Sequence, residues 1–183
     1  MMLPTRAGCQ APRRDNRAVT TAVTTSRAAM PVAASIVIRP AQPEDLATIA
    51  DFNVRLAQES EGLALDPATV HSGVEALLLD PSKGVYVVAE SGGRLVGQLM
   101  LTIEWSDWRN GPIYWLQSVY VVADVRGSGV FRALWERALE IARGNGARAV
   151  RLYVEEHNTS AQEVYRRIGM RDSGYRVFEL EPV

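Results

Sequence analysis

The sequence predicts an α/β fold, with a mixed central sheet, helices on both faces and the element order β-α-α-β-β-β-α-β-α-β. Three observations lead to this fold class. Short apolar runs rich in valine, isoleucine and aromatic residues recur along the chain and are typical of strands. Longer stretches with apolar residues at helical spacing alternate with them. A glycine-rich turn, Gly127-Ser-Gly129, joins one predicted strand directly to a predicted helix.

The predicted domain covers residues 35–183 and begins with a strand at Ile36–Arg39. A helix follows from Pro43, because proline fits the first turn of a helix and the acids after it favour the positive end of the helix dipole. Its apolar face contains Leu46, Ile49, Phe52 and Leu56. Residues 60–66 are predicted to form a loop.

A second helix is predicted to begin at Asp66-Pro67 and to end near Leu79, before Asp80-Pro81. Two strands, Val85–Glu90 and Leu95–Trp105, are then joined by the tight turn Ser91–Gly93, so we expect a hairpin. Residues 106–112 form a polar turn that ends in the two helix and strand breakers glycine and proline.

The remaining elements surround the glycine turn. Trp115–Val122 reads as a strand and Val130–Arg143 as an amphipathic helix. A further strand, Ala149–Val154, leads into a short helix that begins at Asn158, and a last strand is expected after it. Since a glycine turn at a helix N-terminus presents free N–H groups and a positive dipole end, the turn predicts an anion site suited to phosphate or pyrophosphate.

Composition limits the function classes. The chain has 183 residues, 47% of them apolar, and a net charge of −1, which argues against a nucleic-acid partner. No stretch approaches the length of a membrane-spanning helix, so we expect no membrane partner and a cytoplasmic protein. Cys9 is the single cysteine, and His71 and His157 lie far apart, so no metal site is expected.

Residues 1–34 differ in composition from the rest and are predicted to be a disordered tail. They contain five arginines, one acid and many alanines and threonines, with no sustained apolar period. Such a segment can also be a transit peptide. A third interpretation is that Met30 is the true start and that the residues before it carry no function.

Two motifs about thirty residues apart resemble the GNAT N-acetyltransferase superfamily. The first is Asp124–Arg132, between strand and helix, and the second is Asn158–Met170, after the next strand. The resemblance covers about residues 36–181. It implies an acetyl-CoA-dependent enzyme that transfers an acetyl group to a primary amine by direct attack, and its acceptor would be a small-molecule amine or a peptide amine. A non-catalytic module of the same fold that binds CoA or a protein partner is the alternative.

The resemblance also implies cofactor-binding residues. The turn and helix start would hold the pyrophosphate of acetyl-CoA through Arg126, Gly127, Ser128, Gly129, Val130, Phe131 and Arg132. The strand before the turn, with Val119 and Val121, would splay from its neighbour and pair with the pantetheine arm; the alternative is an ordinary core strand. Asn158 would contact the cofactor, although an asparagine at this place also caps a helix.

Tyr165 occupies the position that the resemblance assigns to the acid that protonates the departing thiolate. It also lies on the apolar stripe of its helix, so the alternative is a core tyrosine. The general base is not evident, because Ile113 stands where related enzymes place a glutamate. Glu104 is the first substitute and Glu59 and Glu61 are the second, and deprotonation through water would need none of them.

The turn between the two long strands is rich in aromatic and charged residues. We expect Trp105, Trp108 and Arg109, with Glu59 and Glu61, to bind the amine acceptor, because aromatic walls and carboxylates suit a cation. A packed hairpin end or a dimer contact would explain the same residues. The sequence leaves the identity of the acceptor open and allows a monomer or a homodimer.

Overall fold

The computed structural model describes residues 35–181, so the predicted tail, residues 1–34, lies outside the described part of the chain. The elements follow in the order β1 (Val37–Pro40), the 3-10 turn η1 (Pro43–Asp45), α1 (Leu46–Glu61), α2 (Pro67–Leu79), β2 (Val85–Ser91), β3 (Arg94–Ser106), β4 (Gly111–Val121), the 3-10 turn η2 (Ala123–Val125), α3 (Val130–Gly144), β5 (Ala149–Leu152) and α4 (Thr159–Arg167).

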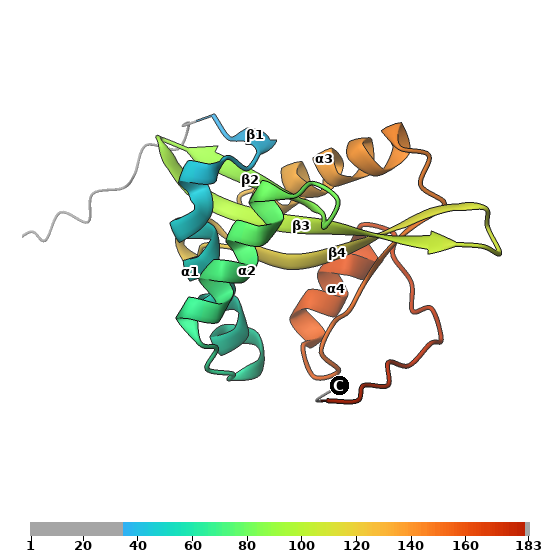
Figure 1. The fold of residues 1–183 in the computed structure, drawn as a ribbon. Helices are drawn as coiled ribbons and strands as arrows, with labels where there is room; N and C mark the ends of the chain where they lie inside the picture. Colours follow the sequence, from blue (N-terminus) through green and yellow to red (C-terminus); the bar gives the residue numbers. More distant parts are fainter. Residues whose placement is uncertain (1–34, 182–183) are drawn as a thin grey trace, which may run out of the picture. The chain divides into compact units, whose positions relative to one another are not determined.

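The five strands form one mixed sheet in the order β1-β2-β3-β4-β5. The first four strands are antiparallel to their neighbours, while β4 and β5 are parallel. The predicted hairpin of residues 85–105 is present as β2 and β3. The next hairpin is longer than expected, since β3 and β4 pair as far as Ser106 opposite Gly111 and leave only residues 107–110 for the turn. In Figure 1 this hairpin projects beyond the helices.

The helices start where local chemistry predicts. Gln42 donates its backbone N–H to the Asp45 carboxylate ahead of α1, at 2.7 Å. The Asp66 carboxylate accepts the Thr69 N–H and caps α2, in which Pro67 occupies the first turn. These bonds satisfy amides that have no partner within the helix.

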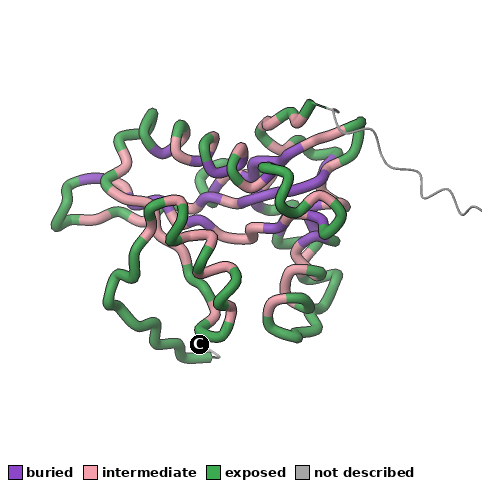
Figure 2. The backbone as a smooth tube through the Cα atoms, turned by 180° about the vertical axis from the view of Figure 1, so that it is seen from behind, coloured by how far each residue is buried: buried purple, intermediate pink, exposed green. Residues whose placement is uncertain are grey.

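Strand register divides the sheet into two faces, and helices cover both (Figure 1). One face carries Leu99 and Leu101, opposite Leu116 of β4, and packs against Leu134 of α3. Residues of α4 pack against the same cluster. On the other face, Tyr86, Val88 and Met100 pack under α1 and α2. Burial is concentrated in the central strands (Figure 2), so the middle of the sheet forms the core between the two helix layers.

The predicted last strand is wrong. No strand follows β5 in the chain up to residue 181, and the segment after α4 runs as an irregular loop (Figure 1). Two causes are visible. Asp172 accepts the Gly174 N–H at 2.8 Å, so a local turn takes a donor that a ladder would use. The neighbouring strand β5 has only four residues and offers a short edge. The apolar residues Tyr175, Val177, Phe178 and Leu180 consequently stay exposed.

Gly97 sets how closely α3 approaches β3. A methyl group at this position would meet Val130 Cγ1 at 3.0 Å, the Tyr120 carbonyl at 3.1 Å and Leu134 Cδ1 at 3.2 Å. Val130 is the first residue of α3, directly after the glycine turn. The small residue therefore fixes the position of the turn relative to the sheet.

Gly97→Ala should lower the free energy of unfolding by about 1–3 kcal/mol, since three close neighbours would have to move. Gly73→Ala is the matched control: it lies inside α2 with no atom near the added methyl group, so it should raise stability by about 0.4–1 kcal/mol. Urea unfolding followed by circular dichroism measures both changes. A neutral Gly97→Ala variant would show that α3 is not held against β3 in this way.

Candidate functional site

The sheet opens between β4 and β5. Within residues 35–181, these two strands pair only from Ile113 opposite Ala149 to Leu116 opposite Leu152. β4 continues to Val121, so residues 117–121 have no partner strand on that side. Val119 and Val121 lie in this segment, where β4 separates from its neighbour as the family resemblance implied. An edge of this kind can pair with an extended ligand as a strand would.

A bulge lies at the same place in β4. Gln98 of β3 is opposite Tyr120, whereas Met100 is opposite Gln117, so β4 contains one extra residue between the two pairs. Ser118 in this stretch has a φ of 49°, in the left-handed region that non-glycine residues rarely adopt. A bulge changes the direction of backbone groups and commonly ends regular pairing. It stands two residues beyond the last β4–β5 pair.

The glycine turn follows at the carboxyl end of β4. Gly127 and Gly129 have φ values of 81° and 93°, and no atom lies within 4 Å of a methyl group added to either. Gly129 precedes α3, and the first helical bond runs from the Ala133 N–H to the Gly129 carbonyl. The N–H groups of residues 130–132 therefore come before the hydrogen-bonding pattern of the helix, in the arrangement that binds phosphate groups.

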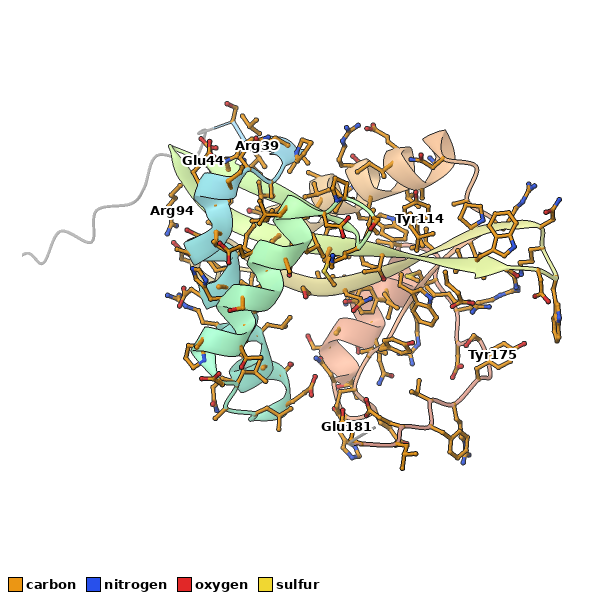
Figure 3. All side chains as sticks on the ribbon, viewed as in Figure 1. Arg39, Glu44, Arg94, Tyr114, Tyr175 and Glu181 are labelled. Atoms are coloured by element: carbon orange, nitrogen blue, oxygen red, sulfur yellow. The ribbon has the colours of Figure 1, made fainter. Side chains whose placement is uncertain are left out.

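The arginines near the turn already have partners. Arg126 forms an ion pair with Glu59 of α1 at 2.5 Å and donates to the Val121 carbonyl at 2.8 Å. Arg132, which is exposed, pairs with Glu136 one helical turn away. Asp124 pairs with Arg94, which Figure 3 labels at the start of β3. Two of the predicted residues, Glu59 and Arg126, are thus brought together beside the turn.

Glu59 has a second partner in Tyr120, whose hydroxyl donates to its carboxylate at 2.8 Å. The Arg126 guanidinium first, and the Tyr120 hydroxyl second, hold the pKa of Glu59 below its usual range. A carboxylate stabilised in its charged form is a weak general base. Tyr120 was not predicted as a site residue, since nothing in an apolar strand distinguishes it from a core tyrosine.

The second motif approaches the first through Tyr165. Its ring meets Phe131 of α3 edge-on, with 6.0 Å between centroids. Burial raises the pKa of Tyr165, and the phenol of an ordinary tyrosine is already protonated at neutral pH. The hydroxyl of Tyr165 makes no hydrogen bond to another group of residues 35–181. Asn158 accepts the Ala161 N–H at 3.0 Å, which confirms the helix-capping interpretation of that residue.

Glu104 lies elsewhere on the sheet. Its carboxylate accepts the Trp115 indole N–H at 2.6 Å and an Arg151 N–H at 3.4 Å. It stands opposite Ile113, five residues before Ser118, and at the usual strand rise this is roughly 16 Å from the bulge. The structure therefore does not bring Glu104 together with Glu59 and Arg126.

The hairpin end lies farther out. Trp108 is 90% exposed and Trp105 is also exposed, as is Arg109. Near the base of the hairpin, Trp115 stacks on Tyr153 at 4.4 Å, and Arg151 lies over both Trp115 and Tyr175. Figure 3 labels Tyr175 on the C-terminal segment. The predicted acceptor residues thus fall into two separate groups, one at the end of α1 and one on the hairpin.

A groove that the sequence did not predict lies beneath α1 and α2. It has a volume of about 470 Å³ and extends from the α1–α2 connection to Ser118 in the bulge. Its wall is mainly apolar, and its polar lining residues are Asn53, Glu61, Lys83, Tyr86 and Ser118. Of the three acids considered as bases, Glu61 is the one that borders this groove. Residues of two helices and three strands form it, so no local motif could reveal it.

Residues 35–181 contain no group of three or more histidine, cysteine, aspartate or glutamate side chains placed to hold a metal ion. In the same residues, no helix combines the length and the apolar composition that crossing a membrane requires.

A mixed sheet that opens at β4, with a glycine turn leading from that strand into a helix, agrees with the acyltransferase class that the comparisons show. Comparison with known families specifies it further: the sequence model of the acetyltransferase (GNAT) family matches residues 44–170, and the chain belongs to this family.

Individual proteins agree with this assignment. The chain is 30% identical over 139 residues to the uncharacterised N-acetyltransferase YhfO of Bacillus subtilis, covering 68% of this chain and 93% of that protein. It is 30% identical to a mycothiol acetyltransferase of Pseudarthrobacter chlorophenolicus, but spans only 47% of that protein. A crystal structure of a possible acetyltransferase from Clostridium difficile superposes with a TM-score of 0.75 at 43% identity, covering 81% of this chain and 98% of that one.

Tyr165→Phe should lessen the loss of stability at alkaline pH. Folding raises the pKa of Tyr165, so above about pH 10 the unfolded chain releases a proton that the folded chain keeps, and unfolding becomes more favourable as pH rises. Melting temperatures measured from about pH 8 to about pH 11 give the difference. Tyr175→Phe, at an exposed position, is the control. Identical pH profiles for Tyr165→Phe and the wild type would contradict burial of this phenol.

Proposed function

We propose that the protein is an acetyl-CoA-dependent N-acetyltransferase that acetylates a primary amine by direct attack. The observation that carries the proposal is the end of β4–β5 pairing at Leu116 and Leu152, directly before a bulged strand that leads into the glycine turn. An extended thioester can occupy such an edge while its anionic end reaches the turn. Membership of the acetyltransferase family supports this assignment.

The cofactor would bind through backbone more than through side chains. The N–H groups of residues 126–132 suit the pyrophosphate, because the two glycines let the chain approach the anion without a side chain in the way. Residues 119–121 would pair with the pantetheine arm as an added strand. Asn158, which already caps α4, would contribute only through its remaining amide group.

In the proposed reaction, the nitrogen lone pair of the neutral amine attacks the thioester carbonyl carbon. A backbone N–H of β4 stabilises the oxyanion that forms. The carbon–sulfur bond then breaks, the amide is released, and the CoA thiolate takes a proton from the Tyr165 hydroxyl. Water returns a proton to Tyr165, and the attacking nitrogen loses one to a base.

The acceptor would enter through the groove beneath α1 and α2, since it ends at Ser118 beside the bulge. Glu61 lines that route and is the acid we propose as base, whereas Arg126 weakens Glu59 and Glu104 lies far from the bulge. The attacking amine can also lose its proton to water, in which case no carboxylate acts as base. A small amine bound at the bulge would not reach Trp105, Trp108 or Arg109, and only a long acceptor such as a peptide would contact them.

A screen for thiol release separates an enzyme from a non-catalytic module. The protein is mixed with acetyl-CoA and a panel of primary amines of differing size and charge, and free thiol is followed with a colour reagent. The proposal requires amine-dependent release with at least one member of the panel. Tight acetyl-CoA binding without any amine-dependent release would favour the binding module instead.

Gly129→Glu should abolish acetyl-CoA binding, because it places a negative charge where the pyrophosphate must bind. Gly146→Glu is the matched control: its φ of 70° imposes similar backbone strain, its surroundings are equally open, and it lies at the opposite end of α3. Calorimetric titration with acetyl-CoA measures both variants, and circular dichroism checks folding. Equal affinity in the two variants would refute the assignment of the turn.

Tyr165→Phe should lower the single-turnover rate of acetyl transfer by about 100-fold or more, the lower end of the cost of losing a general acid. Acetyl-CoA affinity should change little because the ring that packs on Phe131 is kept. An acetyl thioester of a more acidic thiol should partly restore the rate, since its leaving group needs less protonation. Near-normal transfer by Tyr165→Phe would make Tyr165 a core residue only.

A further inference from the structure

Gln98 is an anomaly in the core. Its side chain is completely buried, and within residues 35–181 its Oε1 atom is the one buried side-chain oxygen or nitrogen without a hydrogen-bond partner. The other buried polar residue, Asp45, is satisfied by two bonds from Arg39. A leucine or methionine would fill the same space in β3 without burying an unpaired oxygen. Packing alone therefore does not account for a glutamine here.

The donor end of the Gln98 amide connects the sheet to α1. Its Nε2 donates to the Asn53 Oδ1 at 2.7 Å, and Asn53 in turn donates to the Tyr86 hydroxyl at 2.9 Å. Asn53 and Tyr86 both line the groove proposed for the acceptor. The chain of bonds thus joins β3, α1 and β2 behind the groove wall.

The same amide also reaches the bulge. Gln98 Nε2 lies 3.4 Å from the Ser118 carbonyl oxygen and donates to it. Ser118 is the residue with the left-handed φ of 49° and lines the inner end of the groove. A serine held in this conformation requires surroundings that compensate for its strain. The Gln98 amide, from the adjacent strand β3, supplies a bond to the strained residue itself.

We propose that Gln98 is a positioning residue for acetyl transfer: its amide holds the Ser118 bulge in β4, and the bulge sets the direction of the strand edge that receives the thioester. The inference rests on the proposed function. This role explains why the core keeps the unpaired Gln98 oxygen, because the amide N–H of the same side chain bonds the Ser118 carbonyl and an apolar side chain could not. Gln98 acts through Ser118 and is not itself a catalytic residue.

Gln98→Met tests the proposal, since methionine keeps the volume and removes both bonds. The variant should remain folded, with a modestly lower melting temperature because the Asn53 and Ser118 oxygens lose a donor. Acetyl-CoA affinity at the glycine turn should stay within a factor of about two, while the single-turnover transfer rate should drop by about 10–100-fold, since small misplacements of reacting groups slow transfer to this extent. Leu101→Met, a buried change of similar size on β3 away from the bulge, should transfer acetyl groups at close to the wild-type rate.

Each outcome decides the question. A wild-type rate in Gln98→Met overturns the proposal, as does an equal loss of rate and melting temperature in Gln98→Met and Leu101→Met. Should the wild-type protein transfer acetyl groups to no amine, the proposed function fails separately, and the coupling constant between the amide and α protons of Ser118, measured by NMR, then tests the bulge. A change of this constant in Gln98→Met supports the role of Gln98, and an unchanged value overturns it.

Discussion

The separation of β4 from β5 is the constraint on which the rest of the structure depends. Parallel pairing stops at Leu116 and Leu152, although β4 runs on to Val121. On the side away from β3, residues 117–121 have no partner strand, although the Ser118 and Val121 carbonyls accept bonds from the Gln98 and Arg126 side chains. Such an edge is costly unless water or a ligand satisfies it. In the proposed function, an extended cofactor would form hydrogen bonds with the free backbone groups of this edge and so remove that cost.

In the proposed function, three elements give this opening its chemistry. The glycine turn leaves the amides of residues 130–132 without a partner inside the helix, so they would bind the pyrophosphate. Tyr165 of α4 packs against Phe131 at the start of α3 and would supply the proton for the thiolate. From the other face of the sheet, the groove beneath α1 and α2 leads to Ser118. Cofactor and acceptor would thus approach one short stretch of β4 from opposite faces.

The sequence predicted what local chemistry determines. The turn at Gly127–Gly129 and the helix from Val130 depend on residues that are adjacent in the chain, and both were found within one residue of their predicted ends. The role of Asn158 as a cap followed from the same kind of signal. The bulge at Ser118 could not be predicted, because serine does not favour a left-handed conformation and its bond to Gln98 comes from another strand. The prediction of a last strand was wrong for a related reason, since an apolar alternation forms a strand only where a partner edge exists.

The sequence analysis grouped Glu104 and Trp108 with Glu59 by their chemical type. The register of the long β3–β4 hairpin places Glu104 and Trp108 away from Glu59.

Hydrogen exchange with and without acetyl-CoA tests the central claim most directly. The β4–β5 opening, as the cofactor site, requires that acetyl-CoA slow exchange at residues 117–121 and 126–132 and leave residues 103–109 of the hairpin unchanged. Protection confined to the hairpin, or no protection of either β4 or the turn at saturating acetyl-CoA, would contradict the assignment of this opening as the site of acetyl transfer.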